Sequence, residues 1–186
     1  MDVSIIDLWM PILFSGIAVF FLSFIMWMVL PHHRSDWGPV PDEAGTMAHL
    51  GDLPRGQYMF PHCKDPKQMQ DAEWMKKRNA GPSGILTILP RGPQNMAKSM
   101  LQSFLFNVVI GVIVAYLATM AFGKGADGTT VFRFTATAAF LGYAGALGWQ
   151  VIWFFATWSS TLKTIGDALV YGIVTGVLFM QLWPGV

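Results

Sequence analysis

Long apolar runs constrain this chain more than any other feature of its sequence. Leu8 to Leu30 contains no charged residue, and as a helix rising about 1.5 Å per residue it can cross a ~30 Å hydrocarbon core. Three further runs are similar in length and apolar character, with charges only near the start of the last two. The sequence therefore predicts an all-α membrane protein with four transmembrane helices, at residues 8–30, 100–122, 131–158 and 162–183.

Composition supports this class. The chain is 53% hydrophobic and only 12% charged, which is typical of an integral membrane protein. The net charge of +1 provides no basic excess to neutralise phosphates, so nucleic acid is not expected as a partner. The first apolar run lacks the basic start of a cleaved signal peptide and is expected to stay as a transmembrane helix.

The distribution of Lys and Arg predicts the orientation. Nine of the twelve lie between Pro31 and Lys98. Because positively charged loops stay on the cytoplasmic side, residues 31–98 are expected in the cytoplasm, with both termini outside.

This cytoplasmic segment is interrupted by prolines and predicts a small α+β cap inserted between helices 1 and 2. Short strands are expected at about 57–60 and 85–89, and a helix at about 66–79, with Asp65 as its N-cap. Four aromatic residues supply an apolar surface for partner contact: Trp37, Tyr58, Phe60 and Trp74.

All four histidines and the only cysteine also lie in this segment. His62 and Cys63 are adjacent, and His32 and His33 follow the first helix. Imidazole and thiolate ligands suit copper or zinc, so these four residues are the candidate metal ligands. No pair shows a recognised ligand spacing, and the alternative is a protein without cofactor in which His32 and His33 contact lipid head groups and Cys63 packs in the cap.

Polar residues within the apolar runs are few. Asn107, Gln150 and Gln181 are uncharged candidates for the lining of a channel. Arg133 and Asp167 are expected at opposite membrane faces, with Asp167 meeting Lys163 one turn before it. The absence of ionisable groups near the predicted midplane argues against a proton or ion pathway.

Glycines on the last helix predict close helix packing. Gly172 and Gly176 form a GxxxG pattern, which lets two helices approach closely either within one chain or between subunits. The glycines of Gly123 to Gly128 match a dinucleotide-binding pattern but lie between two membrane helices, where they are expected to form a turn.

Four segments carry a resemblance to a known family. They are Pro31–Trp37, Tyr58–Cys63, Gly81 to Thr87 and Val131–Thr135. The chain resembles small uncharacterised bacterial membrane proteins that have one helix, a Pro-rich polar segment and three further helices. The resemblance implies a multi-pass protein of the bacterial inner membrane. It supplies no activity and no catalytic residues.

Three functions are compatible with these observations. The leading hypothesis is a non-enzymatic membrane subunit or scaffold, which docks a partner or self-assembles, for instance within a respiratory or photosynthetic complex. The alternatives are a small oligomeric channel or transporter, and a metal-binding or redox membrane protein. Membrane lipid and a homo-oligomer or larger membrane complex are the expected partners, and no catalytic residues are indicated.

Overall fold

The computed structural model describes residues 2–185, which divide into two compact units. One unit runs up to Gly38 and resumes at Asn95, and the other is the inserted segment Pro39–Gln94. The insertion accounts for most of the segment that the sequence identified as a cap. We describe each unit by itself.

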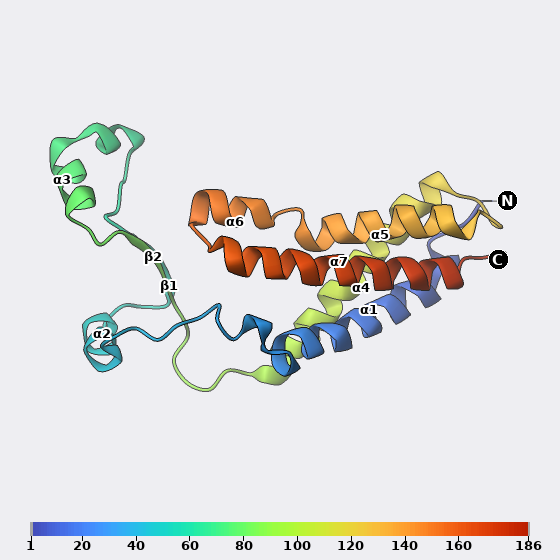
Figure 1. Ribbon diagram of the computed structural model, residues 1–186, viewed down its shortest axis with the longest axis horizontal. Coiled ribbons are helices and arrows are strands. Elements are labelled where there is room, and N and C mark those ends of the chain that lie inside the picture. The colour runs from blue at the N-terminus through green and yellow to red at the C-terminus, as the bar shows by residue number, and fades with distance from the viewer. Residues whose placement is uncertain (1, 186) are drawn as a thin grey trace. The chain divides into compact units, whose positions relative to one another are not determined.

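The first unit is a helical bundle (Figure 1). Three of its helices are long and apolar enough to cross a membrane: Ile6–Val29, Met96–Ala121 and Trp158–Gln181. The bundle comprises α1 (Trp9–Phe24), α4 (Met96–Ala121), α5 (Gly128–Ala144), α6 (Leu147–Phe154) and α7 (Trp158–Gln181). A mostly helical protein is therefore confirmed, and the described residues include three candidate membrane spans.

The core of the bundle forms where α5 packs along α7 and where α1 packs against α4 and α7. Leu8, Val131 and Phe179 are completely buried there. One end of the bundle is tied by two hydrogen bonds between segments distant in sequence. The Trp183 indole donates to the Gly123 carbonyl at 3.0 Å, and the Gly125 N–H donates to the Pro184 carbonyl at 2.9 Å.

The GxxxG face of α7 lies in this core. A Cβ atom added at Gly176 would lie 2.7 Å from the Cβ of Ala136, and one at Gly172 would lie 2.9 Å from the Ala136 carbonyl oxygen. The two glycines are therefore needed for the close approach of α5 within the chain. Of the two expected roles, packing inside one chain is the one seen, and this face is not free for a partner subunit.

The third predicted transmembrane helix is interrupted. Residues 131–158 cover most of α5, all of α6 and the first residue of α7, and a turn at Gly145 and Ala146 separates α5 from α6. Gly142, Gly145 and Gly148 weaken helix formation here by about 1 kcal/mol each relative to alanine. Phe155, with φ of 57°, ends α6 in a left-handed conformation. Since α5 has only 17 residues, about 26 Å of helix, four transmembrane helices are not confirmed.

The second unit contains a small two-stranded sheet, which confirms that part of the predicted α+β cap. β1 (Gly56–Phe60) pairs antiparallel with β2 (Gly84–Ile88), and Tyr58 lies opposite Leu86. The unit also contains α2 (Glu43–Leu50), which the sequence analysis did not predict.

The predicted helix at 66–79 is divided into two parts. Pro66–Gln70 is a 3₁₀ helix whose first N–H groups are capped by Asp65, and α3 (Ala72–Ala80) follows it. Asp71 separates them because its backbone is extended and its side chain accepts a hydrogen bond from the Glu73 N–H. A second N-cap signal therefore lies inside the predicted helix.

The four aromatic residues predicted as a contact surface differ in exposure. Trp37 is 87% exposed and Phe60 is 43% exposed. The Tyr58 hydroxyl donates to the Pro54 carbonyl, and Trp74 is half-buried. Their role in partner contact stays a prediction.

Candidate metal centre

The chain leaves α1 through an unusual turn. Ile25–Val29 is π-helical, with the Leu30 N–H donating to the Ile25 carbonyl at 2.9 Å, and Pro31–His33 then forms a 3₁₀ turn. Single π-helical turns are rare in proteins, and those that are found often lie at functional sites. The turn brings the His33 ring back over the Trp27 indole, with ring centroids 3.8 Å apart and planes within 5° of parallel.

Two consecutive histidines converge on one carboxylate of α7. The Nε2 atom of His33 lies 2.8 Å from Oδ2 of Asp167, and the Nε2 atom of His32 lies 3.1 Å from Oδ1. Asp167 and His33 are each only 5% exposed. A buried carboxylate on a candidate membrane span is therefore paired with both imidazoles of the turn that follows α1.

The other nitrogen of His33 contacts a second carboxylate. Its Nδ1 atom lies 2.6 Å from Oδ2 of Asp36, and Lys163 donates to the other Asp36 oxygen at 2.6 Å. Ser160 also donates to Asp36, at 3.1 Å. We call His32, His33, Asp36 and Asp167 the His–Asp cluster. Because both nitrogens of His33 face acceptors, a metal-free imidazole there must carry both protons to donate on both sides.

The ionisation of the cluster follows from these contacts. Burial, the largest influence, lowers the pKa of His33, but hydrogen bonds and charge from Asp36 and Asp167 more than offset it, so the pKa is raised. The hydrogen bond from His33, followed by that from Lys163, lowers the pKa of Asp36 to about 2. Asp36 is therefore charged at neutral pH, and its contacts favour the charged form of His33 relative to a free imidazole.

Three of these residues form a metal-ligand set. The ligand atoms of His32, His33 and Asp167 all lie within 4.8 Å of one another. Zinc bound at ~2.0–2.1 Å in tetrahedral geometry would separate its ligand atoms by roughly 3.3 Å. The two imidazoles lie 3.1 and 2.8 Å from different oxygens of the carboxylate, so small shifts of these side chains would admit the ion. Metal-binding histidines are usually oriented by a carboxylate that accepts a hydrogen bond from the ring nitrogen not bound to the metal. Asp36 occupies this position next to Nδ1 of His33.

The predicted metal ligands are thus only partly brought together. His32 and His33 lie in the cluster, whereas His62 and Cys63 belong to the second unit. The Cys63 thiol donates to the Asp65 carbonyl at 2.8 Å. With two nitrogens and one carboxylate oxygen, the ligand set suits zinc and not the thiolate chemistry of copper(I).

Sequence reasoning missed Asp167 as a ligand. It was expected to meet Lys163, but Lys163 pairs with Asp36 and leaves Asp167 to the histidines. A signal was available, because Asp167 is the only carboxylate within the four apolar runs. An isolated acid in a membrane helix indicates a functional partner elsewhere in the chain.

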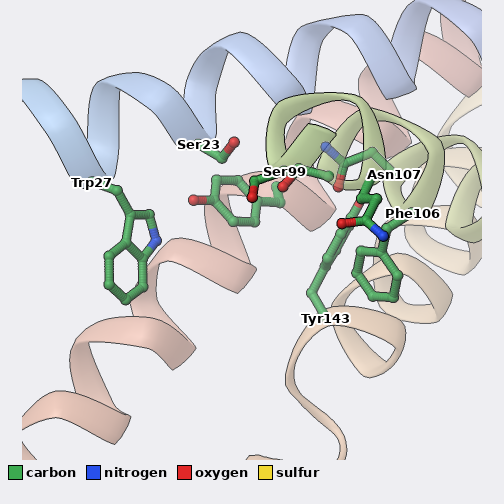
Figure 2. Close-up of a pocket in the computed structure, with 9 residues that line it drawn as sticks. Ser23, Trp27, Ser99, Phe106, Asn107 and Tyr143 are labelled. Atoms are coloured by element: carbon green, nitrogen blue, oxygen red, sulfur yellow. The ribbon is translucent and has the colours of Figure 1, made fainter. Parts of the chain in front are cut away.

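A cavity of about 490 Å³ lies beside the cluster, among α1, α4, α5 and α7 (Figure 2). Its lining carries no charged residue and combines hydroxyl, amide and indole groups with a larger apolar surface, so we call it the polar cavity only for these uncharged polar groups: Ser23, Trp27, Ser99, Gln102, Ser103, Phe106, Asn107, Tyr143 and Tyr171. Trp27 lines the cavity and also stacks on His33. Of the three residues predicted to line a channel, only Asn107 borders this polar cavity; Gln150 lies on α6 and Gln181 ends α7.

No family model, curated protein or solved structure matches this chain. The geometry of the described residues is therefore the basis for assigning a function.

Proposed function

We propose that this protein is a multi-pass protein of the bacterial inner membrane that binds a zinc-class divalent cation through His32, His33 and Asp167. The observation that carries the proposal is the convergence of two consecutive Nε2 atoms on one buried carboxylate. Both imidazoles meet the same buried acid, an arrangement that a cation shared by the three side chains would stabilise. A cation replaces the proton on Nε2 of His33, while Nδ1–H stays bonded to Asp36.

Three protein ligands leave one position of a tetrahedral zinc ion open. Structural zinc sites are closed by four protein ligands, whereas sites with three accept water or a substrate in the fourth position. The proposed centre is therefore of the exchangeable type. The excess of Lys and Arg between Pro31 and Lys98 supports an orientation in which the centre lies at the cytoplasmic end of α1 and α7.

A second candidate is a membrane subunit that docks a partner. The 87% exposure of the Trp37 side chain favours it, because large aromatic residues are enriched at protein interfaces. A Trp37→Ala variant should then lose proteins that co-purify with the wild type in mild detergent. Unchanged co-purification would remove this candidate and leave the cation site untouched.

Zinc titration into the full-length protein tests the leading proposal. The protein should carry no histidine tag and be stripped of metal in detergent. Wild type should bind one Zn²⁺ per chain, and Asp167→Asn, which keeps the shape but loses the charge, should bind at least about 100-fold more weakly. Cys63→Ser and His62→Ala are matched controls from the second unit and should bind as wild type does. Equal binding by wild type and Asp167→Asn would contradict the proposal.

A further inference from the structure

We propose that the polar cavity binds the uncharged, carbonyl-bearing head group of a membrane-soluble amphiphile. The inference is independent of the cation site, because neither histidine of the His–Asp cluster nor either of its carboxylates lines the cavity. Three observations carry it: the chemistry of the wall, an unpaired buried hydroxyl, and the side on which the cavity opens.

The wall selects against charge. Its nine residues provide hydroxyl, amide and indole groups together with aromatic faces, and none of them is ionised at neutral pH. A phosphate or ammonium head group would lose water there without gaining an opposite charge. An uncharged head group that accepts hydrogen bonds can instead use the serine and tyrosine hydroxyls of the lining.

Tyr171 provides a donor that nothing in the structure uses. Its side chain is 8% exposed, and its hydroxyl is buried without a hydrogen-bond partner among the described residues. The oxygen lies near the Trp27 indole but without the geometry of a hydrogen bond. Buried polar groups in native proteins almost always have a partner, so an unused donor that borders a cavity indicates a ligand acceptor such as a carbonyl oxygen.

The cavity opens beside a candidate membrane span. Gln102, Ser103 and Phe106 belong to the apolar helix α4 and are exposed while also lining the cavity. Polar side chains on the outer face of a membrane helix are unfavourable unless they have a polar partner. An amphiphile whose head group enters past these α4 residues, with its tail left in the lipid, supplies that partner.

Two sources share this chemistry, the ring carbonyls of a quinone and the ester carbonyls of a diacylglycerol. Binding to the full-length protein in detergent is measured by calorimetry with three probes: decylubiquinone, dioctanoylglycerol and dioctanoyl phosphatidylglycerol. One neutral probe should bind at one molecule per chain, and which of them does so identifies the source. The phosphatidylglycerol should bind far more weakly. Failure of both neutral probes, or equal binding of the anionic one, would overturn the proposal.

The Tyr171→Phe variant separates binding from folding. It should bind the neutral probe about tenfold more weakly, the loss expected for one hydrogen bond. Its thermal unfolding temperature should be equal to or above that of wild type, because the removed hydroxyl has no hydrogen-bond partner in residues 2–185. Unchanged affinity for the neutral probe would contradict a role for this donor.

A matched pair of substitutions tests the location. Ser103→Phe fills the open side of the cavity and should abolish binding, whereas Val109→Phe adds a ring at an exposed position of α4 that does not line the cavity. Equal effects of the two would place the ligand elsewhere. Asp167→Asn should retain the neutral probe even if it loses zinc, so failure of this inference and failure of the cation proposal are distinguishable.

Discussion

The Nε2 atom of His33 lies 2.8 Å from a carboxylate oxygen of Asp167, a residue 134 positions later in the chain. On the opposite side of the same ring, Nδ1 lies 2.6 Å from Asp36. Two acids and the stacked Trp27 indole therefore determine both the position and the tilt of this imidazole. Metal-binding histidines are typically held in this way by side chains that do not themselves bind the metal.

Loss of the carboxylate behind His33 should weaken zinc binding. Asp36→Asn keeps the size of the side chain but no longer supports the partial positive charge that a bound cation puts on the ring. We expect zinc affinity to fall by about 10- to 100-fold, measured by competition with a chromophoric chelator. Ser160→Ala removes a neutral contact to the same carboxylate and is the control, with a much smaller effect expected. Equal losses in both variants would argue against an orienting role for Asp36.

The helix contact between α5 and α7 should not tolerate a methyl group at Gly176. The added Cβ would lie 2.7 Å from that of Ala136, so Gly176→Ala should destabilise the bundle by about 1–3 kcal/mol. Gly166→Ala lies on the same helix with nothing within 4 Å, and should be neutral or stabilise by up to about 1 kcal/mol. Unfolding of both variants in mixed detergent measures the difference. A neutral Gly176→Ala would contradict the close approach of these helices.

The N-cap of α5 predicts an acid-dependent stability. Asp127 accepts hydrogen bonds from the Thr130 hydroxyl and N–H, which, with the charge of Arg133, lower the pKa of its carboxyl below 3.8. A depressed pKa contributes stability above the unfolded-state value, and that stability is lost as pH falls through the folded-state value. Asp127→Asn keeps a capping oxygen but cannot ionise. The unfolding temperature of wild type should exceed that of the variant at about pH 6, and the difference should shrink as pH falls below 3.8, the ordinary pKa of the carboxyl. A constant difference would contradict the assignment.

Much of this molecule follows from local pattern, and the remainder depends on contacts between distant residues. Apolar length alone indicates the three candidate spans, and short runs of strand-forming residues around Tyr58 and Leu86 indicate the small sheet. The interruption at Gly145 was missed because hydropathy does not distinguish a continuous helix from two helices joined by a turn. His32 and His33 were recognised as ligand types, but their partner Asp167 depends on how α1 and α7 pack.

X-ray absorption spectroscopy of the zinc-loaded, full-length protein tests the central claim most directly. The account predicts a first shell of nitrogen and oxygen at about 2.0–2.1 Å, with the outer-ring scattering of two imidazoles and no sulfur. Asp167→Asn should not retain this spectrum. A zinc–sulfur distance of about 2.3 Å would instead assign the metal to Cys63 and contradict a centre built from His32, His33 and Asp167.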